Sequence, residues 1–141
     1  MSITLKTDKD VMKAILDTNP FISKMGFTPS NIKTTGAGSE IISVSKPEFQ
    51  IFISNTTPEN LGSELVMGIV YSVTVTGNRK QSNRVDEVVE QVIALLHNRD
   101  LGRGHTLFLL DPPLELKSNP NIYIVETTFL CQSTNINVVR T

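Results

Sequence analysis

The stretch of sequence that decides the fold spans residues 64–101 and reads ELVMGIVYSVTVTGNRKQSNRVDEVVEQVIALLHNRDL. Its first half contains Tyr71–Val75, in which Tyr and Val alternate with Ser and Thr. This period of two is typical of an antiparallel strand with one buried and one exposed face. We therefore predict a long strand over Leu65–Thr76, and we expect Gly77-Asn78 to break it.

The second half of this stretch has the spacing of an amphipathic helix. Apolar residues recur every three or four positions over Val85–Leu96, and polar residues occupy the opposite side. Asn83, followed three residues later by Asp86, resembles a capping box that starts the helix. The polar segment from His97 onward ends it. Because this strand and helix carry no pattern typical of catalysis, we expect the unit to serve packing and assembly.

The residues before this unit predict one short helix and two short strands. The helix is predicted from an apolar stripe over Val11–Leu16, with Thr7 as its cap and Asn19-Pro20 as its end. Two short strand candidates, Glu40–Ser45 and the alternating segment Phe49–Ser54, could form a hairpin. The segment between helix and hairpin is rich in loop-forming residues.

The residues after the unit predict two more strands, Thr106–Leu110 and Ile122–Cys131, with a turn at Asp111-Pro112-Pro113. Residues 133–141 are a candidate extended arm. Strands grouped on either side of one major helix predict an α+β fold rather than a wound βαβ fold. We expect a mixed, mostly antiparallel sheet with one major amphipathic helix packed on it and a short N-terminal helix, in a single domain over residues 1–141.

The composition argues against several classes of protein. A net charge of −1 provides no basic surface for coating DNA, and aromatic residues make up only 6%, so stacking platforms for single strands are scarce. The single cysteine, Cys131, cannot form an intrachain disulfide, which suits a reducing compartment. No apolar run approaches the ~20 residues that cross a bilayer, and no signal-peptide segment opens the chain. We expect a soluble cytoplasmic protein without membrane association.

Candidate motifs for catalysis, cofactors and metals are weak. Gly36-Ala37-Gly38 lacks the third glycine and the Lys-Ser/Thr pair of a phosphate loop. His97 and His105 do not have metal-ligand spacing, and Cys131 is the only thiol. We interpret the glycine segment as a loop and His97 as a helix C-terminal residue favoured by the helix dipole. We expect no catalytic residue, no cofactor and no metal site, and we predict that the protein is not an enzyme.

Charged residues on and around the main helix are candidate contacts with other subunits or partners. The acidic residues lie on its polar face, and basic residues gather at its two ends. These basic residues could touch phosphates, but acidic neighbours in the same segments favour turn solubility or salt bridges between subunits. The candidate contact residues are Arg79, Arg84, Glu87, Glu90, Arg99 and Arg103.

On these elements the chain resembles the tail-terminator, or tail-completion, proteins of long-tailed bacteriophages. In that family a Tyr-x-Val-x-Val strand leads through a polar turn into a helix with Val and Leu at helical spacing. A short strand, a proline-containing hairpin and a long closing strand follow. The corresponding features here are the N-terminal helix around Val11–Leu16, then Tyr71–Val75, Val85–Leu96, Asp111-Pro112-Pro113 and Tyr123–Phe129.

The resemblance implies a homohexameric ring that caps the tail tube, ends tail polymerisation and presents a surface for joining the head. It also implies partners: other copies of the chain, the major tail tube protein and a head-completion or connector protein, with DNA passing through the lumen without specific binding. The implied location is the head-proximal end of the virion tail, after assembly in the host cytoplasm. The alternatives are another head–tail connector or neck protein, a small-molecule-binding α+β module or enzyme, and a nucleic-acid-binding protein.

Overall fold

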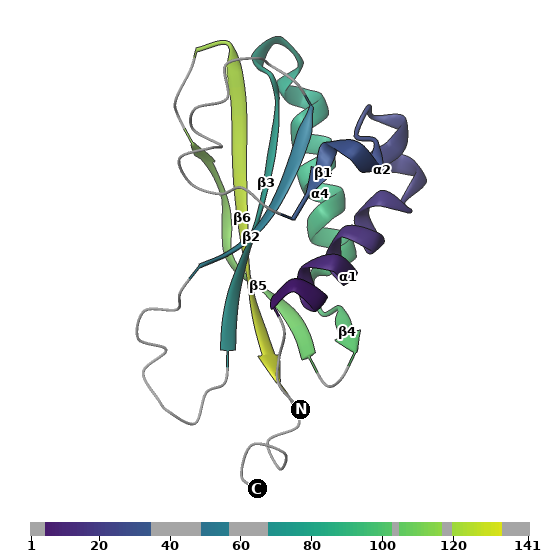
Figure 1. Ribbon diagram of the computed structural model, residues 1–141. Helices are drawn as coiled ribbons and strands as arrows, with labels where there is room; N and C mark the ends of the chain where they lie inside the picture. Colours follow the sequence, from purple (N-terminus) through teal and green to yellow (C-terminus); the bar gives the residue numbers. More distant parts are fainter. Residues whose placement is uncertain (1–4, 35–48, 57–67, 103–104, 117–119, 134–141) are drawn as a thin grey trace, which may run out of the picture.

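The computed structural model describes residues 5–34, 49–56, 68–102, 105–116 and 120–133 (Figure 1). In this part of the chain, six strands form one sheet in the order β1-β2-β3-β6-β5-β4, and the helices lie together on one of its faces. Among the paired strands, β1 and β2 are parallel and the others antiparallel. The elements are α1 (Leu5–Asp17), α2 (Pro20–Lys24), the 3-10 turn η1 (Pro29–Asn31), β1 (Ile32–Lys33), β2 (Gln50–Thr56), β3 (Gly68–Asn78), the 3-10 turn η2 (Arg79–Gln81), α4 (Ser82–Leu96), β4 (Asp100–Gly102), β5 (His105–Leu116) and β6 (Ile122–Ser133).

This architecture confirms the predicted α+β class, with a mixed, mostly antiparallel sheet, one main helix and a short N-terminal helix. The main helix α4 packs its apolar stripe against β3, β5 and β6. Helix α1 covers the neighbouring part of the same face and contacts both β2 and α4. The buried residues of α4 are Val85, Val88, Val89, Val92 and Leu96.

The antiparallel pair β3–β6 forms the centre of the sheet and is matched along the whole of β3. Residues 65–67 of the predicted strand lie outside the described residues. The predicted break at Gly77-Asn78 is wrong, because both residues continue the pairing with β6. Gly77 is required for packing instead: a Cβ atom there would lie 2.6 Å from Cγ2 of Val85 and 2.8 Å from the ring of Phe49.

The prediction that β3 exposes its polar face is also wrong. Ser72, Thr74 and Thr76 point away from the helices, yet each is at most 2% exposed. On that face Phe52 of β2 pairs with Thr74, and Ile124 of β6 pairs with Thr76. Phe52 and Ile124 belong to a second, smaller apolar cluster. The sheet therefore buries residues on both faces, with the larger core under the helices.

Strand β5 is longer than predicted. The expected turn at Asp111-Pro112-Pro113 lies inside the strand, where the register against β6 shifts between Leu109 and Asp111 and again before Leu114. Proline cannot donate to a strand ladder, so the two prolines sit where pairing is interrupted. The long β6 still offers partners beyond them, and pairing resumes from Leu114 to Leu116.

The predicted capping box of the main helix does not form. Helix α4 begins at Ser82, with Gln81 at its N-cap and no side-chain capping bond. The 3-10 turn η2 leads directly into the helix, and the side chain of Asn78 caps that turn by accepting a 2.9 Å hydrogen bond from the amide of Lys80. The carboxylate of Asp86 accepts instead from a hydroxyl on β6.

The N-terminal predictions are partly correct. Helix α1 begins at Leu5, so Thr7 lies within its first turn and does not cap it. Helix α1 ends at Asp17, before Asn19-Pro20, as predicted. The Asn19 side chain then caps α2 by accepting hydrogen bonds from two backbone amides. Strand β2 confirms the second predicted strand. The candidate strand Glu40–Ser45, the loop around residues 36–38 and the arm over residues 134–141 lie outside the described residues.

None of the described helices is long and apolar enough to cross a membrane.

Candidate functional site

Arg79, the first predicted contact residue, is engaged within its own chain. Its guanidinium donates hydrogen bonds to Oε2 of Glu115 at 2.9 Å and to the carbonyl oxygen of Ile122 at 3.1 Å. The same group lies over the ring of Tyr123, 5.4 Å from the ring centroid. Arg79 therefore ties the start of the main helix to β5 and β6.

Arg84 is also engaged within its own chain. Its guanidinium lies over the ring of Phe49, 5.2 Å from the centroid, in a cation–π arrangement. Phe49 in turn packs against Phe27 with a centroid distance of 5.3 Å. This side chain therefore covers an aromatic pair beside the N-terminal end of α4.

Glu87, Glu90 and Arg99 are exposed and form no ion pair with any described residue. Glu87 and Glu90 lie on α4, and Arg99 follows its C-terminal end. Arg103 lies outside the described residues. The 15-residue helix is about 22 Å long, so it separates the basic residues at its two ends. The five predicted contact residues that the structure describes do not lie together in a single patch.

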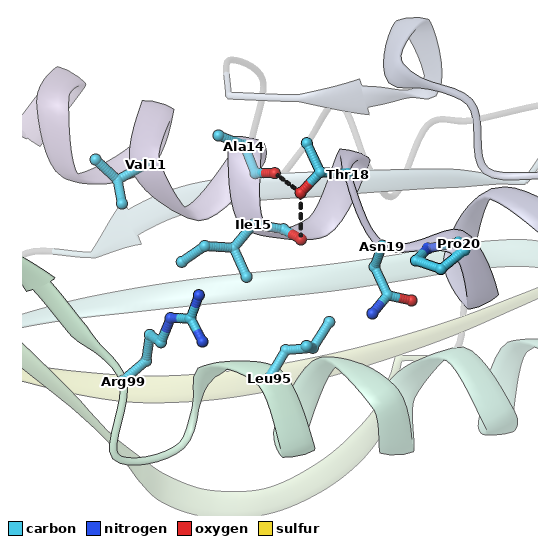
Figure 2. A pocket seen from close by; sticks show the side chains of 8 residues that line it. All are labelled: Val11, Ala14, Ile15, Thr18, Asn19, Pro20, Leu95 and Arg99. Atoms are coloured by element: carbon cyan, nitrogen blue, oxygen red, sulfur yellow. Dashed lines mark hydrogen bonds between the residues drawn. The ribbon is translucent and has the colours of Figure 1, made fainter.

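A shallow, open groove of about 490 Å³ runs between α1 and α4 (Figure 2). Arg99 lies at one end of this groove, beside Ile15, and Asn19-Pro20 lies at the other end. Among the predicted contact residues that the structure describes, Arg99 is the one that lines this groove. The lining residues are Val11, Ala14, Ile15, Thr18, Asn19, Pro20, Leu95 and Arg99.

An apolar segment is exposed on the opposite side of the sheet. Leu110 and Leu114 of β5 are 44% and 59% exposed. Leu114 pairs with Glu126, which alternates along β6 with the buried, helix-facing Val125. Facing residues of an antiparallel pair share one face of the sheet. Leu114 therefore lies on the face turned away from the helices.

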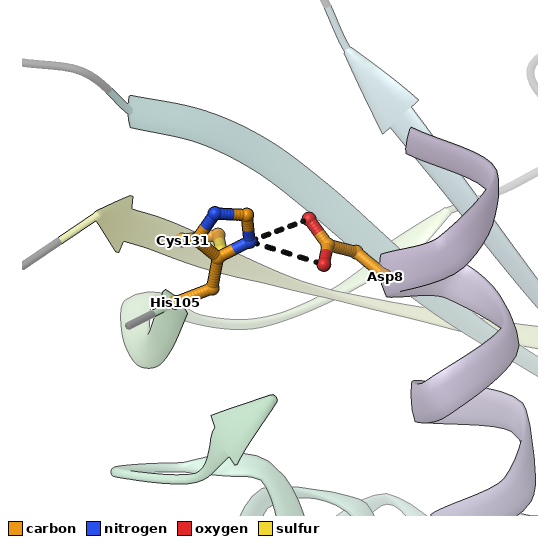
Figure 3. Close-up of side chains that lie close together, drawn as sticks. All are labelled: Asp8, His105 and Cys131. Carbon is orange, nitrogen blue, oxygen red and sulfur yellow. Dashed lines mark hydrogen bonds and ion pairs between the residues drawn. The ribbon is translucent and has the colours of Figure 1, made fainter. Parts of the chain in front are cut away.

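A buried polar cluster joins α1 to the sheet (Figure 3). The Tyr71 hydroxyl donates a 2.9 Å hydrogen bond to Oδ2 of Asp8, and Nδ1 of His105 lies 3.2 Å from both carboxylate oxygens. The thiol of Cys131 lies beside them, and the ligand-type atoms of Asp8, His105 and Cys131 are all within 4.8 Å of one another. Each of these four residues is at most 5% exposed.

This cluster satisfies a buried carboxylate by hydrogen bonding. A carboxylate on the apolar side of a helix is costly unless donors compensate it. Here a tyrosine and a histidine supply them, so Asp8 needs no bound ion to be buried. The groove between α1 and α4 does not include any member of the cluster. We interpret the cluster as a structural clamp that holds α1 on the sheet.

Sequence reasoning missed this cluster because it paired His105 with His97. The structure places them apart: His97 is the C-cap of α4, as predicted, and its Nδ1 accepts a 3.0 Å hydrogen bond from the amide of Leu109. A usable signal was the spacing of Asp8, Met12 and Leu16, which repeats every four residues and is fully buried. An acid on such a stripe predicts a buried donor elsewhere in the chain.

The fold is similar to that of a chain in the solved structure described as "Virion of native gene transfer agent (GTA) particle". The two share 12% sequence identity with a TM-score of 0.59, and the likeness covers 88% of this chain and 92% of that chain. No protein-family model and no curated protein matches the sequence. The similarity therefore shows a common fold over nearly the full length of both chains.

Proposed function

We propose that this chain is a structural protein of a phage-like virion, and that it acts as a tail terminator. The observation that carries the proposal is the fold likeness to a chain of a gene transfer agent virion, which spans 88% of this chain and 92% of the other. The arrangement of strands around α4 supports the same proposal, because the tail-terminator resemblance implied this order of elements. The proposed role is to cap the tail tube, end its polymerisation and present a surface for joining the head.

The surface of the described residues suits assembly. A ring of identical copies needs two different, complementary surfaces on each copy. Glu87, Glu90 and Arg99 are exposed charges without ion-pair partners among the described residues, so they are free to meet a neighbour. The net charge of −1 is compatible with a lumen through which DNA passes without specific binding.

The finer parts of the proposal are a homohexameric ring, contacts with the tail tube protein and a head-completion or connector protein, and a position at the head-proximal end of the tail. We propose no catalytic role. A small-molecule-binding module is less well supported, because the groove between α1 and α4 is shallow and open rather than enclosing.

The oligomeric state of the purified chain tests the ring. We expect native mass spectrometry and light scattering to give the mass of a homohexamer, and negative-stain images to show closed rings. A chain that stays monomeric up to high micromolar concentration would contradict the proposal. Small-molecule binding by such a monomer would favour the binding-module alternative.

Deletion of the gene in its phage or prophage distinguishes terminator from neck protein. Without a terminator the tube protein has no stop, so we expect tails longer than normal that lack heads, with normal length restored by a plasmid copy. Tails of normal length that fail to join heads would instead favour the connector or neck alternative. Intact virions would rule out both.

A further inference from the structure

We propose that the ring contact is made by residues 110–114 of one copy, which insert into the groove between α1 and α4 of the next copy. This inference rests on the proposed ring-forming function and names the two surfaces that meet. The occupant of the groove is thus a second copy of this chain. Three features of the described residues support this choice.

The first feature is apolar complementarity. Leu110 and Leu114 are, with Phe21, the large apolar side chains that are most exposed among the described residues. The groove offers apolar atoms from Val11 and Leu95 to receive them. Removing such side chains from water favours association. The prolines between the two leucines restrict the backbone, which lowers the entropy lost on docking.

The second feature is charge complementarity. Asp111 stands between the two exposed leucines, and Arg99 stands at one end of the groove. Both are exposed, and neither forms an ion pair with another described residue. An Asp111 carboxylate that meets the Arg99 guanidinium of the next copy would set the register of the apolar contact. Arg99 is also the predicted contact residue that lines the groove.

The third feature is the placement of the two surfaces. The groove lies on the helical face, whereas Leu114 lies on the opposite face of the sheet. In a twofold-symmetric dimer, two surfaces on opposite sides of each copy cannot both be buried against the partner copy. They form a head-to-tail contact instead, which leaves one free surface at each end until the chain of copies closes into a ring.

Charge reversal tests the register of this contact. We expect Arg99→Glu and Asp111→Arg each to shift the light-scattering mass from the ring to the monomer, and the double variant R99E/D111R to restore the ring. Circular dichroism should show unchanged folding, because both residues are exposed. Lys33→Glu is a matched control, because it also reverses an exposed charge. Lys33 lies on β1 and belongs neither to the groove nor to residues 110–114, so this variant should still form the ring.

Mixing two defective variants tests the head-to-tail character. Ala14→Glu damages the groove and Leu114→Glu damages the inserting segment, so each variant alone should be monomeric. An equimolar mixture should form dimers and nothing larger, because one intact groove meets one intact segment and both free ends are defective. Rings from either variant alone would overturn the inference.

These results separate the inference from the function on which it rests. If the unmodified chain forms rings and the variants do so equally well, the inference is wrong and the ring proposal stands. If the unmodified chain remains a monomer, the ring proposal itself fails.

Discussion

The hydroxyl of Tyr71 on β3 donates a 2.9 Å hydrogen bond to the carboxylate of Asp8 on α1, across 63 positions of sequence. Both side chains are completely buried, and His105 approaches the same carboxylate from β5. A single carboxylate thus connects the N-terminal helix to two strands. The attachment of α1 to the sheet depends on hydrogen bonds as well as on apolar packing.

Tyr71→Phe should therefore lower the free energy of unfolding by about 1–3 kcal/mol, because Asp8 loses a buried donor while the ring still fills its place. Urea denaturation followed by circular dichroism measures this. Tyr123→Phe is the matched control, since Tyr123 also donates to a carboxylate but is partly exposed; its loss should stay below about 1 kcal/mol. Equal losses in the two variants would contradict the importance of the buried clamp.

Gly77→Ala should destabilise the protein by about 1–3 kcal/mol through overpacking, because the new methyl group would lie 2.6 Å from Cγ2 of Val85. Val85→Ala in the same chain should recover part of the loss, so the double variant should be more stable than the sum of single effects predicts. Gly102→Ala is the contrasting control. It has a φ of +95°, and no atom of the described residues lies within 4 Å of a new Cβ, so its cost is backbone strain that Val85→Ala cannot relieve. If the destabilisation of the double variant Gly77→Ala/Val85→Ala equals the sum of the two single destabilisations, the proposed contact between the new methyl group and Val85 is contradicted.

Gly77 also illustrates how far the sequence alone predicts this fold. The apolar repeat within residues 82–96 and the alternation within residues 69–75 are local patterns, and they correctly predict α4 and much of β3. A glycine between them looks the same in sequence whether it ends a strand or makes room for a neighbouring helix. Which role applies depends on Phe49 and Val85, which contact it only in the folded chain.

Some features of the candidate site are likewise predictable from local sequence patterns, and others are not. The charges on α4 and beside it were predictable as exposed, because they oppose its apolar stripe. The contacts that engage Arg79 and the cluster around Asp8 depend on residues more than 30 positions away, and a periodic pattern carries no such information. The strand that continues past Pro112-Pro113 likewise depends on the length of its partner β6.

Thr127→Val should stabilise the protein by about 1 kcal/mol. The Thr127 hydroxyl is buried on the helical face of β6 and has no hydrogen-bond partner among the described residues. Valine has nearly the same shape and suits a strand, and it removes the cost of an unpaired polar group. The neighbouring Thr128→Val, which alters a half-buried residue on the other face, should change stability by less than about 0.5 kcal/mol. A destabilised Thr127→Val in thermal and urea melts would reveal a hidden partner for this hydroxyl.

Tyr123 should lose its phenolic proton at a higher pH than an ordinary tyrosine. Burial, then its hydrogen bond to Asp86 and the negative charges of Asp86 and Glu115, raise the pKa of Tyr123 from 10.0 to about 12, against the opposing effect of Arg79. Between these values the unfolded chain loses this proton while the folded protein keeps it. The corresponding stability is therefore complete below pH 10 and is lost as the pH rises toward about 12. Tyrosinate absorbance should show this late transition in the unmodified protein, and Tyr123→Phe should remove it; a transition near pH 10 that the substitution removes would contradict the assignment.

Arg79, Glu87 and Glu90 were all predicted as contact residues, but we expect substitutions of Arg79 to affect stability and substitutions of the two acids to affect assembly. Arg79→Ala removes its bonds to Glu115 and Ile122 and its stacking on Tyr123, and should cost about 1 kcal/mol of stability because the ion pair is partly exposed.

Glu87→Ala and Glu90→Ala break no ion pair among the described residues, so their free energies of unfolding should stay within about 0.5 kcal/mol of the original. If these acids face a neighbouring copy, as predicted, the combined Glu87→Ala/Glu90→Ala variant should lower the fraction of rings in native mass spectrometry without changing the urea midpoint of the monomer. Unchanged ring formation would show that these two acids do not contribute to the contact between copies.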